Sequence, residues 1–200
     1  MASSLVAPLP TFSTQPLPTI SVNCKKLFRL GRYGSGEPYF GTSAGNRFDD
    51  PNQIFGTCYV GFDLATAVAE TVLHDEIPVQ GRFGISKSDF EGRHLVRFPS
   101  GALLKVANFT GASLKTIVGD SSISTVFPYD LPQVWSEAVH THPKKVDGII
   151  YVSRQLNDRK AVVIFDRAKA KLGAATYLLL GKSKSMQHVR DELHIDYTAP

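Results

Sequence analysis

The chain has 200 residues, 42% of them hydrophobic and 20% charged, a composition typical of one globular domain or of one domain with an arm. Its apolar runs are far shorter than a bilayer-spanning helix, and Cys24 and Cys58 are too few for a disulfide framework, so we expect no membrane contact and a reducing, cytoplasmic location. The formal charge of +4 suits an anionic ligand, but no clustered basic face or known motif indicates direct nucleic-acid binding.

The first 26 residues differ in composition from the rest of the chain. They contain four prolines, and their first charged residue is Lys25. Pro8 and Pro10 would interrupt the apolar core of a secretory signal, and a transit peptide would be rich in arginine, which is absent here. Proline favours extended backbone. We therefore expect residues 1–26 to form an extended arm, wrapped over the domain or partly disordered, and residues 27–200 to form a single domain.

Short apolar segments and amphipathic segments alternate irregularly after the arm. Asp63 stands where the N-cap of the first predicted helix should be. Residues 35–53, rich in Gly, Ser, Asn, Asp and Pro, predict a loop. Strands are predicted at 27–34, 54–62, 82–86, 94–98, 102–107, 147–153, 160–165 and 176–180, and helices at 64–75, 111–119, 132–142 and 184–193. This irregular mixture favours an α+β fold over a doubly wound parallel sheet.

Glu70 is the first candidate functional residue. The predicted helix over 64–75 places Leu64, Ala67 and Val68 on one apolar face and Glu70 at its edge, in line with Ala67. A glutamate in such a position is usually a solvated flank residue. Alternatively, it is a carboxylate at the rim of a cleft, where it could stabilise a cationic transition state or accept a proton.

Two arginines and a tyrosine precede it. Arg47, in the predicted loop, could pair with Asp49 or Asp50 at the surface, or could offer its planar donor fork to a phosphate. Arg29, inside an apolar strand, needs a partner, which could be a buried carboxylate or an anionic ligand in the same cleft. Tyr59 could be an ordinary core residue or a ring that stacks on a ligand.

Ser153 ends the apolar segment "DGIIYVS", a position where serine commonly terminates a strand and caps the next turn. No GxSxG elbow and no P-loop occur. His140 and His142 are two residues apart in a predicted helix and therefore face different ways, so we expect no metal site.

The order of these residues resembles that of the RES domain, a family named for its Arg, Glu and Ser that supplies the toxin half of a bacterial toxin–antitoxin system. The resemblance covers about residues 25–170, with Asn46 and Phe48 where the family often has glycine and tryptophan. Four segments carry it: "LFRLGR", "GNRFDDPNQIFGTCYVGFDLATAVAET", "PQVWSEAVHTHPKKVDGIIYVSRQ" and "KAVVIFDR".

The resemblance implies an ADP-ribosyltransferase-like fold, with a mixed β core and flanking helices, and NAD as the substrate. By resemblance, Arg29 and Arg47 would hold the pyrophosphate or ribose, Tyr59 would pack on the nicotinamide side, and Glu70 and Ser153 would lie at the reacting ribose. The implied activity is NAD glycohydrolase or NAD phosphorylase, with protein ADP-ribosylation as the alternative. The implied partner is an antitoxin of the Xre type, and a homo-oligomer is a further option.

Elementary chemistry agrees with this assignment. Cleaving the nicotinamide–ribose bond builds positive charge on the ribose, which a nearby carboxylate stabilises. Nicotinamide is already cationic and leaves without a proton, so one carboxylate is enough and no metal is needed. A third, non-enzymatic interpretation is a binding module that uses the basic clusters "PKK" and "GKSKS", although these are short and lack interleaved aromatic residues.

Overall fold

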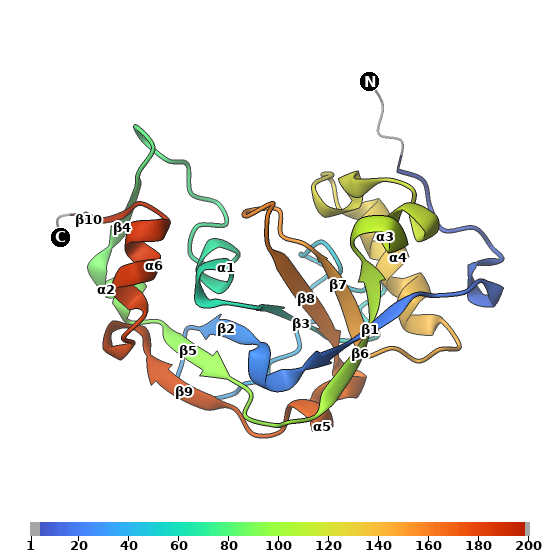
Figure 1. Cartoon of the computed structure of the whole chain (residues 1–200), viewed down its shortest axis with the longest axis horizontal. Coiled ribbons are helices and arrows are strands. Elements are labelled where there is room, and N and C mark those ends of the chain that lie inside the picture. Colours follow the sequence, from blue (N-terminus) through green and yellow to red (C-terminus); the bar gives the residue numbers. More distant parts are fainter. Residues whose placement is uncertain (1–4, 199–200) are drawn as a thin grey trace.

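The computed structural model describes residues 5–198, and its centre is a mixed eight-stranded sheet in the order β1-β6-β7-β8-β3-β2-β5-β9 (Figure 1). β6 and β7 are parallel, and the other neighbouring pairs are antiparallel. The strands are β1 Thr19–Asn23, β2 Phe28–Gly31, β3 Thr57–Gly61, β5 His94–Arg97, β6 Leu103–Phe109, β7 Gly148–Val152, β8 Lys160–Phe165 and β9 Thr176–Leu179.

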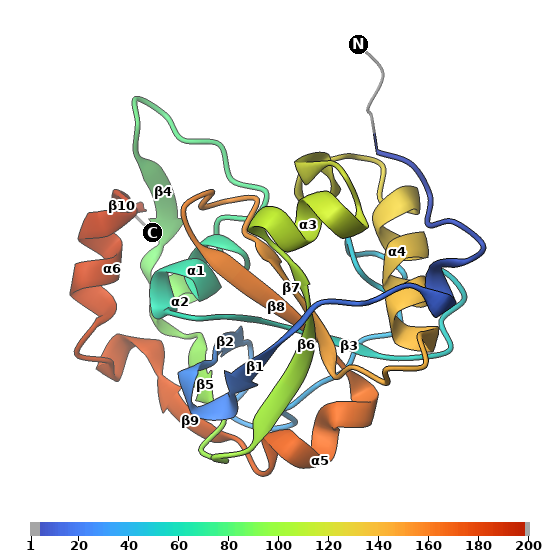
Figure 2. The same cartoon turned by 45° about the vertical axis from the view of Figure 1, so that its right-hand side comes forward.

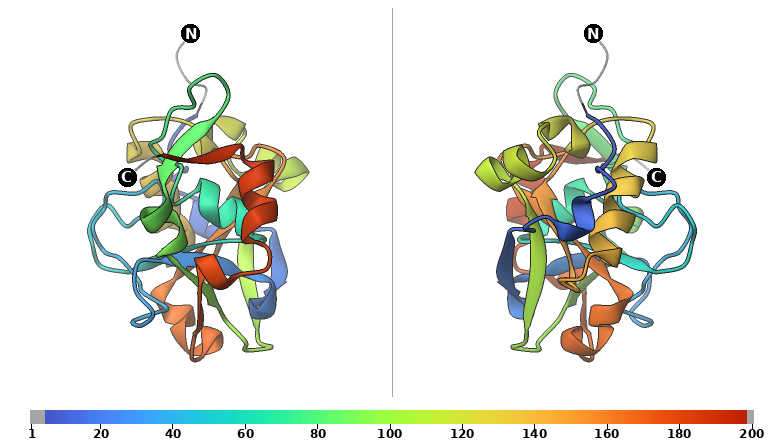
Figure 3. Two further views of the ribbon diagram at one scale, coloured as in Figure 1. Left: turned by 90° about the vertical axis from the view of Figure 1, so that its left-hand side faces the viewer. Right: turned by 90° about the vertical axis from the view of Figure 1, so that its right-hand side faces the viewer.

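Helices and a second, small sheet cover the ends of this sheet. The small sheet pairs β4 (Phe83–Ser86) with β10 (Ile195–Thr198) in parallel. The helices are α1 Leu64–Ala69, α2 Lys87–Glu91, α3 Gly111–Ile117, α4 Asp130–Thr141, α5 Lys169–Leu172 and α6 Met186–Glu192. α3 and α4 lie at one end of the molecule, α6 and the small sheet lie at the other, and α1 lies between them (Figures 1 and 2). The two ends face the viewer in turn in Figure 3.

The centre of the large sheet is apolar on both faces. In β8, Val163 packs into one buried cluster, whereas Val162 and Ile164 pack into another. Side chains alternate between the faces of a strand, so the uninterrupted apolar run of β8 fits a strand buried on both sides. The first of these clusters contains side chains of α4, and a third gathers around α1, α6 and β5. The expected α+β class, with a mixed β core and flanking helices, is confirmed.

All eight predicted strands are present: β8 has the predicted bounds, β6 begins one residue later and extends to Phe109, and the other six are shorter than predicted. The sequence patterns did not indicate β1, β10, α2 or α5. β1 lies in the segment expected to be an extended arm, and it pairs with β6 at the edge of the large sheet. Leu5, Phe12 and Leu17, also in that segment, are buried. Residues 1–4 of the expected arm and residues 199–200 lie outside the described part of the chain.

The predicted helix over 64–75 was wrong in its length and its environment. α1 ends at Ala69, and Glu70 is its C-cap residue rather than a residue inside the helix. After it the carbonyl of Val68 accepts hydrogen bonds from the N–H groups of Thr71, Val72 and Leu73, which closes a tight turn. All six residues of α1 are buried, so the helix is enclosed rather than amphipathic.

Local sequence explains how α1 begins. Asp63 caps it as expected, since its Oδ1 accepts a hydrogen bond of 2.7 Å from the N–H of Thr66. Gly61, at the end of β3, permits the close approach of the helix, because a Cβ there would lie 2.9 Å from Cβ of Thr66. The turn from β3 into α1 therefore fixes where Glu70 emerges.

Candidate functional site

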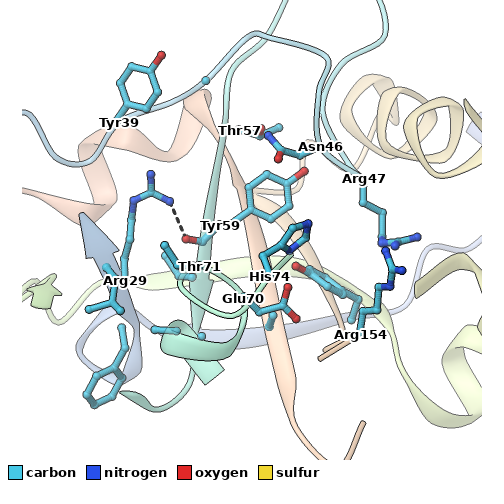
Figure 4. Close-up of a pocket in the computed structure, with 18 of the residues that line it drawn as sticks. Arg29, Tyr39, Asn46, Arg47, Thr57, Tyr59, Glu70, Thr71, His74 and Arg154 are labelled. Atoms are coloured by element: carbon cyan, nitrogen blue, oxygen red, sulfur yellow. Dashed lines mark hydrogen bonds between the residues drawn. The ribbon is translucent and has the colours of Figure 1, made fainter. Parts of the chain in front are cut away.

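A cavity of about 360 Å³ opens beside β2, β3 and α1, and four of the five predicted site residues line it. These four are Arg29, Arg47, Tyr59 and Glu70, and Figure 4 shows them around one space. The fifth, Ser153, does not line the cavity but is 1% exposed and forms a hydrogen bond with Glu70. The structure thus brings together residues that are spread over more than half of the chain.

Ser153 orients the side chain of Glu70. The Oγ of Ser153 donates a hydrogen bond to Oε1 of Glu70 and accepts hydrogen bonds from the N–H groups of Gln155 (3.2 Å) and Leu156 (3.0 Å). The serine therefore both caps the turn after β7, as its position in the sequence suggested, and orients the carboxylate. The carboxylate of Glu70 points into the cavity (Figure 4). A hydrogen-bonded carboxylate with a fixed direction is suited to stabilising positive charge that develops in front of it.

Arg29 has its own carboxylate partner. Its Nε donates to Oε1 of Glu37 at 2.8 Å, and its Nη1 donates to the carbonyl of Tyr59 at 3.0 Å (Figure 4). Glu37 is only 7% exposed at the side chain and also accepts from the N–H of Tyr39. The ion pair considered from the sequence is therefore present, and it ties β2 to the loop that comes after it.

Arg47 has a different environment. It is 7% exposed, and its Nη1 donates to the carbonyls of Val126 (2.7 Å) and Ile123 (3.4 Å). Its guanidinium lies 4.6 Å from the centre of the Tyr129 ring. Burial lowers the pKa of Arg47, and Arg154 lowers it further, whereas Tyr129 raises it. Within residues 5–198 no carboxylate pairs with Arg47, so the surface pairing considered from the sequence does not occur.

Asp49 instead organises the loop that carries Arg47. Its carboxylate is buried and accepts hydrogen bonds from Ser43 Oγ, the backbone and side-chain N–H groups of Asn46, Thr57 Oγ1 and the hydroxyl of Tyr59. Burial, and then the charge of Asp49, raise the pKa of Tyr59 well above its usual range. Tyr59 therefore stays neutral, and its ring forms part of the cavity wall (Figure 4).

α4 supports the same loop from the other side. The Nε2 of Gln133 donates to the carbonyls of Ala44 (2.8 Å) and Asn46 (3.0 Å), and the Oγ of Ser136 donates to the carbonyl of Phe48 (2.7 Å). The ring of Phe48 is fully buried. The loop before β3 is therefore held by β3 and α4 together, although its sequence predicts no regular structure.

Sequence reasoning missed several residues that line the cavity. Arg154 is the next residue after Ser153 in "YVSRQ", so its position beside a candidate residue was an available signal. Tyr129 lies just before α4 in a stretch with no predicted element, and nothing in the sequence pointed to it. The other missed polar or aromatic residues of the wall are Phe28, Tyr39, Asn46, Thr57, Thr71, His74, Asp75 and Tyr151.

The two histidines considered for metal binding have packing roles. His140 stacks on Phe55 with 3.8 Å between ring centres, and Nε2 of His142 lies 3.2 Å from the carbonyl oxygen of Gln15. Among residues 5–198, no group of three or more His, Cys, Asp or Glu side chains could hold a metal ion. None of the helices in this range is both long and apolar enough to cross a membrane.

Comparisons with known proteins bear on the family and the fold of the chain. The family model of the RES domain matches residues 26–185. A solved structure, described as the crystal structure of the M. tuberculosis MbcT–MbcA toxin–antitoxin complex, contains a chain of similar fold. The TM-score is 0.55 at 12% sequence identity, and the match covers 80% of this chain and 84% of that chain. No curated protein matches the chain.

Proposed function

The chain belongs to the RES domain family, and from that premise we propose that it is a toxin enzyme that consumes NAD by cleaving the bond between nicotinamide and ribose. The observation that carries the proposal is the contact between Ser153 and Glu70, which directs a carboxylate into a cavity lined by arginine and tyrosine side chains. NAD itself is anionic at its pyrophosphate, aromatic at both ends and cationic at the nicotinamide ring, so such a cavity suits its parts.

In this proposal Glu70 stabilises the positive charge that develops on the ribose as the bond breaks. Ser153 positions that carboxylate. The ring of Tyr59 contacts the nicotinamide side, and Arg47 and Arg29 serve the anionic part of the substrate. Nicotinamide leaves with the electron pair of the broken bond, which neutralises its ring, so no proton donor is needed.

The acceptor of ADP-ribose is water or inorganic phosphate in this proposal. Transfer to a protein side chain is the alternative, because the same cleft and carboxylate would serve it. We also propose a cytoplasmic site of action and an antitoxin partner of the Xre type. The similarity of fold to a chain of a toxin–antitoxin complex supports the antitoxin partner.

The test is incubation of the purified chain with NAD, with and without phosphate, and chromatography of the products. We expect NAD to disappear with the wild-type chain and with Glu76→Gln, a change at an exposed glutamate that does not line the cavity. We expect no loss of NAD with Glu70→Gln. Undiminished consumption by folded Glu70→Gln would refute the role of Glu70, and no consumption by the wild type under any condition would refute the proposal.

A second measurement separates the alternative. Cell lysate is incubated with the enzyme and with NAD labelled in its ADP-ribose part, and the proteins are then analysed by mass spectrometry. Label that remains covalently attached to protein would identify a transferase. Label found only in small molecules would support cleavage by water or phosphate.

A further inference from the structure

Arg154 lies opposite Arg47 at one end of the cavity. Both residues line it, and Figure 4 shows the two guanidinium groups facing each other, one from the loop before β3 and the other from the end of β7. Their proximity is also evident electrostatically, since the charge of Arg154 is among the causes that lower the pKa of Arg47. Two positive charges held close together repel each other, and an anion bound between them would offset this repulsion by attracting both.

In the part of the chain that the structure describes, no carboxylate is in contact with either arginine, and burial is the main cause that lowers the pKa of Arg47, with the charge of Glu70 as a smaller opposing cause. Among residues 5–198, no ion pair involves either side chain, and no hydrogen bond involves the side chain of Arg154, which is exposed. Arg47 uses its Nη1 on two backbone carbonyls, and its other donors remain for a ligand. The two guanidinium groups together therefore present several unused N–H donors to the cavity.

Arg29 provides the contrast within the same cavity. Its charge is balanced by Glu37 at 2.8 Å, and its Nη1 is used by the carbonyl of Tyr59. The cavity thus has a neutralised end at Arg29 and a positively charged end at Arg47 and Arg154. An anionic group of a ligand will favour the second end.

We propose that Arg154 and Arg47 together form a binding site for a phosphate group, with Arg154 as the exposed donor and Arg47 as the buried one. Arginine is suited to this role because its planar fork matches two phosphate oxygens at once. This inference deepens the proposed function and rests on it for the identity of the ligand. It replaces Arg29 with Arg154 as the second anion donor.

The phosphate group could come from two sources. One is the pyrophosphate of NAD, bound as the substrate enters. The other is inorganic phosphate acting as acceptor, in which case a phosphate oxygen forms the new bond to the ribose carbon while the bond to nicotinamide breaks. The electron pair of that broken bond goes to the nicotinamide ring, and the products are ADP-ribose phosphate and nicotinamide.

Direct binding tests the site without any catalysis. Isothermal titration calorimetry would measure the affinity of the full chain for inorganic pyrophosphate and for inorganic phosphate. We expect Arg154→Gln to weaken binding of at least one probe by roughly tenfold or more, as for loss of a charge-assisted contact. Arg154→Lys should recover part of the affinity. The matched control is Arg32→Gln, an exposed arginine outside this cavity, which should bind like the wild type.

Kinetics separates the two sources. A raised KM for NAD in Arg154→Gln, with kcat nearly unchanged, would assign the site to the pyrophosphate of NAD. Loss of a stimulation by phosphate that the wild type shows, at unchanged KM for NAD, would assign it to the acceptor. Either result supports the site.

The proposal is overturned if neither probe binds the wild-type chain, or if folded Arg154→Gln binds both probes as well as Arg32→Gln does. A chain that binds pyrophosphate through Arg154 but never consumes NAD would refute the proposed function and keep the anion site. If the wild-type chain consumes NAD and Arg154→Gln binds both probes as tightly as the wild type, the anion site is refuted and the proposed function is kept.

Discussion

The hydroxyl of Ser153 donates its hydrogen bond to the carboxylate of Glu70 across 83 positions of the sequence. Ser153 directly follows β7, and Glu70 is the C-cap residue of α1. Because both lie where a regular element stops, the backbone around each is fixed by the sheet or by the cap of the helix. The pair therefore holds its geometry without a ligand, and such preorganisation makes a carboxylate effective in catalysis.

Replacing Ser153 by alanine should lower the rate of NAD consumption by roughly 10- to 100-fold, because a carboxylate without its charge-assisted donor is less well oriented. The midpoint of thermal unfolding should fall only slightly, because the turn after β7 loses the hydroxyl that accepts hydrogen bonds from its N–H groups. Ser185→Ala, at an exposed serine with no side-chain cap bond, is the control and should retain full activity. An unchanged rate in folded Ser153→Ala would remove the serine from the site.

Replacing Asp49 by asparagine should destabilise the protein by about 2–4 kcal/mol, because a buried acceptor of several hydrogen bonds is exchanged for a group that cannot accept them all. Urea denaturation would measure the loss. The activity of the remaining folded fraction should fall as well, since Asp49 orders the loop of Arg47. Asp158→Asn, at an exposed position, should change neither quantity. Equal stability of the two variants would contradict the role of Asp49.

Phe12 tests the packing of the N-terminal segment. Its ring is 5% exposed and meets Trp135 of α4 edge-on, with 5.2 Å between ring centres. Phe12→Ala should therefore cost about 3–5 kcal/mol, as for a large ring removed from a core. Leu9→Ala, at a side chain that is 63% exposed, should cost almost nothing. Denaturant unfolding curves of the two variants would measure these losses of stability. If Phe12→Ala loses as little stability as Leu9→Ala, the N-terminal segment is not part of the core.

His140 should make stability depend on pH. Burial, and after it the charge of Arg167, lowers the pKa of His140 to about 4, from an ordinary value of 6.5 in the unfolded chain. Asp166 and Asp50 oppose this shift, and Lys145 adds to it. The unfolded chain then binds more protons between pH 4 and 6.5, so this contribution to stability is complete above pH 6.5 and is lost as pH falls towards 4.

The measurement is the free energy of unfolding at several pH values in that window. His140→Leu should flatten the dependence, whereas His188→Leu, at an exposed histidine, should leave it as in the wild type. If the three chains lose stability in parallel, other groups account for the acid sensitivity.

The sequence was informative for candidate residues that lie directly beside a recognisable apolar segment. Ser153 follows a strongly apolar segment, so a strand end could be anticipated there, whereas Glu70 was expected inside a helix over 64–75 and instead caps the end of α1. Tyr129 and Arg154 enter the cavity through tertiary packing, which no local pattern encodes. β1 was missed because the prolines around it suggest open chain, whereas pairing with β6 supplies its hydrogen bonds.

The dependence of the Arg47 loop on α4 has a consequence for proteolysis. α4 holds that loop through Gln133 and Ser136, and its Trp135 and Val139 share a buried cluster with Leu5 and Phe12. A protease cut in the exposed stretch 13–14 would separate these two residues from the rest of the chain. Digestion at a point remote from Glu70 would then loosen α4 behind the loop, and the proposed activity would be lost although no bond in the cleft is cut.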